Sequence, residues 1–227
     1  MLLIFAVIWL AIHIGISGTP LRDRLKAALG EKVFLAVYSV LSIGAIAALV
    51  SAYNKASPTP LWFAPDWLRW GLVLVMLPAF ILLVASVASP NPTAVGADLR
   101  PAGAGDDPVR GIFRLTRHPM MCAFSIWAVV HIVANGTDTA LIFFGTFAIT
   151  ALAGMPSIDA KLARRDPARW APIAAHTSII PGAAILAGRN RLDLREIGWL
   201  VPLLGLVIWA LILGAHPHVF GVPALPS

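Results

Sequence analysis

The sequence predicts an all-α protein, a polytopic bundle of about six transmembrane helices with both termini on the outer, periplasmic side. Three observations support this fold class. Hydrophobic residues make up 59% of the 227-residue chain and charged residues 12%, and the mean hydropathy of +0.83 exceeds what a water-soluble domain needs for one core. The apolar residues gather in separate runs. The basic residues fall between alternate runs.

Six apolar runs predict the spans, at about residues 2–18, 33–52, 68–89, 120–134, 140–155 and 197–214. A helix rises about 1.5 Å per residue and the hydrocarbon layer is about 30 Å thick, so about 20 residues cross it, and the shorter runs must borrow flanking residues. The first run is expected to be a span because it lacks the basic start and the small-residue cleavage site of a signal peptide. The chain is therefore expected to form one integral-membrane domain over residues 1–227.

The basic residues predict the orientation. Of the 17 Lys and Arg residues, all but Lys55 and Arg69 lie in the first, third and fifth loops. Since cytoplasmic loops are enriched in Lys and Arg, these three loops are expected to be cytoplasmic. The same distribution accounts for the net charge of +6 without a nucleic-acid partner, because the charges are dispersed along the membrane instead of clustered on one domain. Contact with anionic lipid is a secondary expectation.

The connections between the runs carry further signals. Pro90-Asn91-Pro92 is expected to end the third run, because proline removes a backbone donor and restricts the residue before it, and a Gly-, Ala- and Pro-rich connection follows as far as Gly111. Asn135-Gly136-Thr137-Asp138 predicts a tight outer turn in which Thr137 or Asp138 caps the next helix. Residues 156–196 mix charged and apolar side chains and are predicted to form a cytoplasmic loop at the membrane interface.

Two histidines, His13 and His131, lie deep inside apolar runs. Counted along the helix from Arg22 and Arg117, His13 lies about 13 Å and His131 about 21 Å from the inner boundary, whereas His118 lies within a residue of it. A titratable side chain at such a depth is costly unless it has a partner or a function. These two histidines are therefore the best candidates for a site near the middle of the membrane.

A spacing of four residues places each of these histidines between an aromatic and a polar residue on one helix face, namely Trp9 and Ser17, and Trp127 and Asn135. Two neutral imidazoles can hold a metal ion or a haem iron between them, with the second ring nitrogen of each bonded to a partner such as Ser17 or Asn135. Haem fits better than a bare ion, because the spans supply no intramembrane carboxylate or thiolate pair, and Cys122 is the only cysteine. The alternative is that each histidine only bonds to a neighbouring helix.

Arg117-His118-Pro119 forms a second constellation at the entrance to the fourth run. Proline in the first turn and arginine at a membrane boundary are ordinary features of a helix start. Asp159, Lys161, Trp170 and Thr177-Ser178 are expected to join it at the cytoplasmic mouth of the bundle, where they would provide paired charges and hydroxyls.

Six stretches of the sequence carry a resemblance to a known family. They are residues 10–21 with His13 and Ser17, Gly30-Glu31 before Phe34 and Tyr38-Ser39, Thr116–Pro119, Trp127 with His131 and Asn135-Gly136, Ile158–Lys161, and Thr177-Ser178 with Pro181. Together they resemble the NnrU family of bacterial membrane proteins associated with denitrification and nitric oxide metabolism. That family is itself similar to the plant and cyanobacterial 15-cis-zeta-carotene isomerase, a membrane haem b enzyme. The resemblance implies a multi-pass protein of the bacterial inner membrane, haem b as the cofactor, and His13 and His131 as its axial ligands.

The resemblance leaves two uses of such a haem open. One is cis-trans isomerisation of a polyene such as 15-cis-zeta-carotene, which would enter from the lipid into a pocket walled by Trp9 and Trp127. The other is nitrogen-oxide metabolism, with nitric oxide binding the iron after one histidine dissociates. The chain departs from the isomerase at Ala128, where that enzyme carries a cysteine, and Cys122 lies about two and a half turns from His131.

Two other classes are alternatives. Arg117-His118-Pro119 also resembles the S-adenosylmethionine-dependent membrane methyltransferases that act on isoprenylcysteine or phospholipid. Met121 stands where those enzymes usually have tyrosine, and Asp159 and Lys161 occupy the region where they have paired glutamates. A non-enzymatic assembly or transport factor would bind neither haem nor S-adenosylmethionine.

Overall fold

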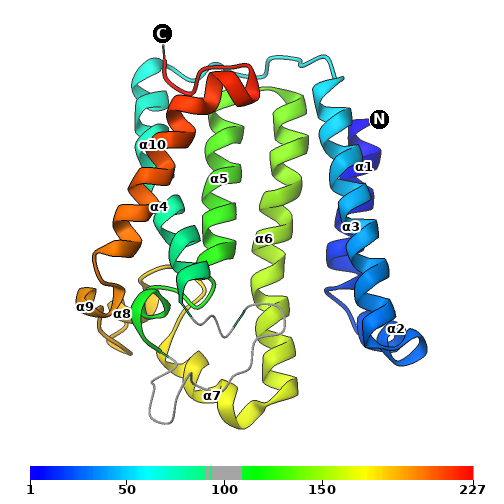
Figure 1. The fold of residues 1–227 in the computed structure, drawn as a ribbon, viewed down its shortest axis with the longest axis vertical. Coiled ribbons are helices and arrows are strands. Elements are labelled where there is room, and N and C mark those ends of the chain that lie inside the picture. Colours follow the sequence, from blue (N-terminus) through cyan, green and yellow to red (C-terminus); the bar gives the residue numbers. More distant parts are fainter. Residues whose placement is uncertain (90–92, 94–108, 227) are drawn as a thin grey trace. The chain divides into compact units, whose positions relative to one another are not determined.

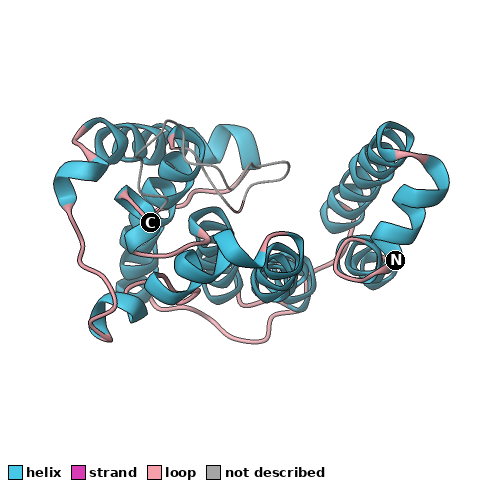
Figure 2. Cartoon of the chain, turned by 90° about the horizontal axis from the view of Figure 1, so that it is seen from below, coloured by secondary structure: helices cyan, strands magenta, loops and turns pink. Residues whose placement is uncertain are grey.

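The computed structural model describes residues 1–89, 93 and 109–226. The expected proline stop at 90–92 and most of the Gly-rich connection after it lie outside these residues. The described part is helical and contains no β-strand (Figure 2), with one isolated bridge between Pro60 and Thr137. The prediction of an all-α protein is thus confirmed. The chain divides into two compact units, Met1–Ala64 with Ala128–Ser157, and Pro65–Trp127 with Ile158–Ser227.

The first unit begins with a bent pair of helices. α1 (Leu2–Leu10) continues into the π-helix η1 (Ala11–Ile16), and the chain then turns by 79° into α2 (Leu21–Leu29). Pro20 stands at the start of α2, where its lack of a backbone N–H costs no helical hydrogen bond. α3 (Glu31–Asn54) returns alongside α1 (Figure 1). Ala6 of α1 and Ala45 and Leu49 of α3 are buried apolar side chains.

A glycine turn completes the first unit between the end of α5 (Pro119–Asn135) and the start of α6 (Asp138–Arg165). Gly136 has φ +62°, and a Cβ atom there would lie 2.1 Å from the Trp62 carbonyl oxygen. The Asp138 carboxylate accepts from the N–H of Thr139 at 2.6 Å, and the Thr137 hydroxyl accepts from the N–H of Ala140 at 3.2 Å. The predicted tight turn and its capping residues are therefore confirmed.

The second unit contains α4 (Asp66–Ala88) and α10 (Leu200–Phe220), which pack side by side (Figure 1). The two helices approach each other closely at Gly205, where an added Cβ would lie 2.8 Å from Ile81 Cγ1 and 2.9 Å from Ile81 Cα. The indole of Trp209 donates to the Val73 carbonyl at 3.1 Å. The short elements of this unit are η2 (Gly111–Arg114), α7 (Pro167–His176), α8 (Ala183–Leu186) and α9 (Leu194–Ile197).

Four of the described helices, α3, α4, α6 and α10, are long and apolar enough to cross a membrane. The bent pair formed by α1–η1 and α2 would make a fifth if it crosses as one span, and α5 is a shorter apolar helix of 17 residues. These helices support the membrane assignment. The count of six spans and the outward orientation of both termini stay predictions.

The region 156–196 differs from the predicted loop because much of it is helical. α6 runs through Pro156 to Arg165, and Asp166 then caps α7 by accepting from the N–H of Arg169 at 3.2 Å. Trp170 and Ile173 of α7 pack against Leu162 of α6 in a buried cluster. These two apolar side chains therefore pack within the protein and not at a lipid interface.

Candidate functional site

His13 lies on a widened helical turn of the first unit. The N–H groups of a π-helix reach back five residues, as in the 3.1 Å bond from Ser17 to the Ile12 carbonyl. Nδ1 of His13 lies 3.0 Å from the carbonyl oxygen of Trp9. Since a carbonyl oxygen only accepts, Nδ1 donates the hydrogen bond, and Nε2 of the neutral ring presents its lone pair. Single π turns inside α-helices are frequent at functional sites.

Aromatic side chains hold the His13 ring on two sides. The Trp9 indole stacks on it with ring centroids 3.7 Å apart, and Tyr38 of α3 approaches edge-on at 5.8 Å. The indole is fixed in turn by a 3.0 Å hydrogen bond from its Nε1 to the Thr150 hydroxyl of α6. Three elements of the first unit, α1, α3 and α6, therefore determine the orientation of this imidazole.

His131 lies in the last turns of α5, one turn after Trp127. Its ring stacks on Phe144 of α6 with centroids 4.8 Å apart. Asn135 was expected to bond to a ring nitrogen of His131, but its Nδ2 donates to the His131 backbone carbonyl at 2.7 Å. The amide of Asn135 thus donates to a backbone carbonyl at the end of α5, and the Phe144 ring packs against the imidazole of His131.

A series of ring contacts joins the two histidines within the first unit. It passes from His13 through Trp9 to three phenylalanines of α6 and ends at His131. The centroid distances are 5.4 Å for Trp9–Phe147, 5.2 Å for Phe147–Phe143, 5.0 Å for Phe143–Phe144 and 4.8 Å for Phe144–His131. The sequence reasoning missed these phenylalanines, although their spacing of one and four residues signals an aromatic stripe on a helix.

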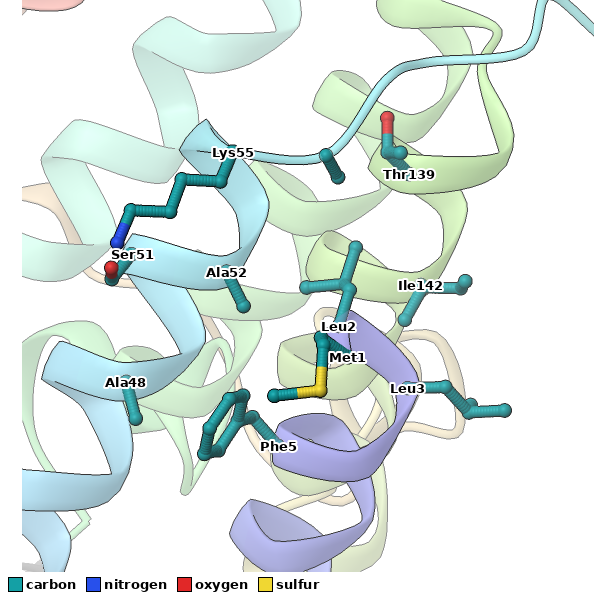
Figure 3. Close-up of a pocket in the computed structure, with 11 residues that line it drawn as sticks. Met1, Leu2, Leu3, Phe5, Ala48, Ser51, Ala52, Lys55, Thr139 and Ile142 are labelled. Atoms are coloured by element: carbon teal, nitrogen blue, oxygen red, sulfur yellow. The ribbon is translucent and has the colours of Figure 1, made fainter.

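A cavity of about 700 Å³ also lies in the first unit (Figure 3). Apolar side chains of α1 and α3, such as Phe5 and Ala52, form much of its wall, and Ile142 contributes from α6. Ser51 of α3 and Lys55, the residue after its last, are polar lining residues. None of the predicted site residues lines this cavity. It offers an apolar molecule space beside the helix that carries His13.

Arg117, His118 and Asp159 form a buried network in the second unit. Arg117 donates to Asp159 Oδ2 through Nε at 2.9 Å and through Nη2 at 2.6 Å, and His118 Nε2 lies 2.7 Å from Oδ1. The side chains of Arg117, His118 and Asp159 are 13%, 0% and 16% exposed. Three residues that the sequence assigned to the mouth of the bundle therefore lie together, where the start of α5 meets the end of α6.

Backbone carbonyls complete this network. Nη1 of Arg117 donates to the Thr177 carbonyl at 3.1 Å, and the backbone N–H of Arg117 donates to the Ser178 carbonyl at 3.0 Å. The Thr116 hydroxyl donates to the Ile179 carbonyl at 2.8 Å. All of these groups donate to backbone carbonyls of residues 177–179, so the network holds this segment against the start of α5. The Arg117 guanidinium also lies 5.9 Å from the ring centroid of Trp170.

Two polar groups lie beside these hydrogen bonds but take no part in them, Nδ1 of His118 and the side chain of Lys161. Nδ1 of His118 is buried and has no hydrogen-bond partner among the described residues. When the Asp159 carboxylate accepts from Nε2–H, this Nδ1 is a buried acceptor, which costs about 1–3 kcal/mol. Lys161 follows Asp159 by two residues, about 200° around α6, and therefore projects from another face of the helix.

The two residues that bear on the isomerase comparison are both buried. Ala128 is fully buried and supplies no ligand atom. Cys122 lies in the second unit with its Sγ 3.5 Å from the Thr116 hydroxyl and 3.6 Å from the Ile179 carbonyl. Its thiol therefore packs beside the arginine network and is not a substitute for a cysteine at position 128.

Comparison with known proteins gives one family and two similar enzymes. The chain is 28% identical over 225 residues to the chloroplastic 15-cis-zeta-carotene isomerase of Arabidopsis thaliana, covering 95% of this chain and 57% of that protein. It is 26% identical over 203 residues to the enzyme of the same name from Zea mays, covering 84% of this chain and 52% of that protein. The chain thus spans about half the length of these relatives. No solved structure matches it. The family model described as NnrU protein matches residues 1–224, and the chain therefore belongs to the NnrU family.

Proposed function

We propose that this chain is an isomerase-like protein of a bacterial inner membrane, which acts on a hydrophobic polyene and holds haem b between His13 and His131. Similarity to two 15-cis-zeta-carotene isomerases, over 95% and 84% of the chain, supports the class of reaction. The helices that are long and apolar enough to cross a membrane support a substrate that dissolves in lipid.

The orientation of His13 is the observation that carries the haem proposal. Its Nδ1–H is bonded to the Trp9 carbonyl, which leaves the Nε2 lone pair for a metal. A second hydrogen bond of this kind is the usual way in which a protein orients a ligating histidine. His131 supplies the second neutral imidazole, and bis-imidazole ligation suits haem iron.

The chain's own side chains would orient the reactants and exclude water. Trp9 fixes the His13 ring by stacking and is itself held by Thr150. Phe143 and Phe144 are buried, so the apolar cluster between the two histidines excludes water. A bound haem would supply an iron centre at which a carbon–carbon double bond can be weakened. The cavity beside α1 and α3 is the proposed route for an apolar chain.

The first experiment measures visible absorption of the full chain, purified in mild detergent, as isolated and after reduction. We expect a Soret band that is lost in His13→Ala and in His131→Ala. His216→Ala is the matched control, because His216 is only partly buried and its Nδ1 is hydrogen-bonded to the Val222 carbonyl at the end of α10. A colourless preparation, even after haem is supplied, would refute the ligand pair.

The second experiment tests the reaction. The protein is expressed in the dark with tri-cis-zeta-carotene, and the isomers are separated chromatographically. We expect loss of the 15-cis isomer, and no loss with a haem-loaded protein would reject the isomerase. Nitric oxide binding without isomerisation would instead favour the nitrogen-oxide function. Calorimetric binding of S-adenosylmethionine without haem would favour a methyltransferase, although the inward hydrogen bonds of Arg117 and Asp159 argue against a ligand there.

A further inference from the structure

The chain from Ser178 to Trp199 in the second unit, which we call the interfacial segment, places large apolar side chains on its outside. Ile180 is 70% exposed, Leu186 91%, Leu194 70% and Trp199 75%. Leu192 is also exposed, at 41%. A water-soluble surface exposes single apolar residues, whereas five large ones in 22 residues of short helices and turns point to an interaction surface.

Hydrogen bonds on the inner side hold the interfacial segment in this arrangement. The Ser178 hydroxyl accepts from the N–H of Ala184 at 3.0 Å and donates to the Ile180 carbonyl at 2.8 Å. The N–H of Gly182 donates to the Leu115 carbonyl at 2.8 Å. These contacts turn the polar groups inward, so the outward position of the apolar side chains is set by the fold.

Glu196 anchors the far end of the interfacial segment. Its carboxylate accepts from Arg114 Nε at 2.7 Å, from Arg114 Nη2 at 2.8 Å and from the N–H of Gly111 at 2.7 Å. The Arg114 hydrogen bonds in particular lower the pKa of Glu196 to about 2. The α9 turn is thus fastened to η2 while Leu194 and Arg195 face outward.

Arginines accompany the exposed apolar residues. Arg191 and Arg195 are exposed, and in the described part of the chain neither guanidinium has a partner. Arg189 differs, because its Nη1 donates to the carbonyls of Ala175 and Thr177 at 2.8 and 3.0 Å. Two unpaired guanidinium groups beside exposed leucines suit the interface of a membrane, where apolar acyl chains lie next to anionic headgroups.

The interfacial segment also continues directly into a candidate membrane span. Trp199 is followed by α10, which begins at Leu200 and is 6% buried over its apolar window. Tryptophan is enriched at the ends of membrane helices, where its ring lies at the level of the headgroups. We propose that the interfacial segment is a lipid-binding surface, with Leu186, Leu194 and Trp199 in the outer acyl region and Arg191 and Arg195 paired with the phosphates of anionic phospholipid.

Site-directed spin labelling tests the depth of the segment. The full chain, in a Cys122→Ser background, is labelled at Leu186→Cys or Leu194→Cys, with Ala171→Cys on the exposed face of α7 as the control. In vesicles of phosphatidylcholine and phosphatidylglycerol we expect greater access to oxygen than to a water-soluble nickel complex at 186 and 194, and the reverse at 171. Preferential access of the nickel complex at 186 and 194 would overturn the proposal. Exclusion of both reagents there would also overturn it, in favour of a protein partner.

The lipid class is tested by the association of spin-labelled phosphatidylglycerol relative to phosphatidylcholine. One basic residue near an anionic surface favours binding about fivefold. We therefore expect Arg191→Gln with Arg195→Gln to lower the preference for phosphatidylglycerol by about fivefold or more, and Arg69→Gln, at the start of α4, to leave it unchanged. An unchanged preference in the double variant would overturn the assignment of these arginines.

Discussion

The network of Arg117, His118 and Asp159 predicts a large and specific loss of stability in Asp159→Asn. The amide keeps the shape of the side chain, and its oxygen can still accept from His118. The position of Oδ2 then carries an NH₂ group, so the two Arg117 hydrogen bonds of 2.9 and 2.6 Å are lost and a guanidinium that is 13% exposed is left unpaired. Breaking a buried ion pair on one side costs about 3–5 kcal/mol. We expect the lower end, about 3 kcal/mol, because the Arg117 contact with the Thr177 carbonyl survives.

The assay is a double-mutant cycle of thermal unfolding in one detergent. Arg117→Met removes the buried charge, so the double variant is expected to lose at least about 2 kcal/mol less than the sum of the single variants. Asp23→Asn is the control, because Asp23 and Arg22 form an exposed ion pair at 3.5 Å that should contribute less than about 1 kcal/mol. The reasoning would be refuted if Asp159→Asn and Arg117→Met each lowered stability as little as Asp23→Asn does and if their losses simply added in the double variant.

Three further predictions concern single positions. Glu196 has a pKa of about 2 in the folded chain against an ordinary value of 4.5, so its contribution is fully present above pH 4.5 and is lost as the pH falls toward 2. Glu196→Gln should therefore lower the free energy of unfolding at pH 7 by about 1 kcal/mol and reduce its fall between pH 4.5 and pH 2. An unchanged fall over that pH range would contradict this. Gly136→Ala should lower the melting temperature markedly, since the new Cβ would lie 2.1 Å from a carbonyl oxygen; wild-type stability would show that the turn is not as described. Gly205→Ala should weaken the packing of α10 on α4, whereas Gly214→Ala on the same helix, with nothing within 4 Å of its Cβ, should be neutral or stabilising; equal effects in the two variants would argue against close contact.

Apolar content predicted the long apolar helices, but not all of their ends, and it did not predict α2 or α7. Pro156 was expected to close a run, yet α6 continues to Arg165, because a proline inside a long helix is tolerated when its neighbours satisfy the freed carbonyl. Whether Trp170 packs against protein or lipid could not be derived from its own segment. That depends on contact with Leu162, which only the tertiary fold determines.

The sequence likewise predicted only part of the candidate site. Arg117 and His118 are neighbours in the sequence, and the expectation that Asp159 joins them came from placing both stretches at the same mouth of the predicted bundle; the three side chains do lie together. The hydrogen-bond partner of His13 was not predictable, because it is the backbone carbonyl of Trp9. A pattern of side chains does not indicate which backbone carbonyl a histidine will bond to. Ligation by His13 and His131 stays a prediction.

The π turn at residues 11–16 has a consequence for how this helix tolerates insertions and deletions. A π turn is equivalent to an α-helix that has gained one residue, and one residue corresponds to about 100° of rotation. Deletion of one residue after His13 is therefore expected to restore regular α-helix and to rotate α1 relative to α2, although the apolar character of the run would hardly change. The facing direction of Trp9 thus depends on the length of this segment as much as on its composition.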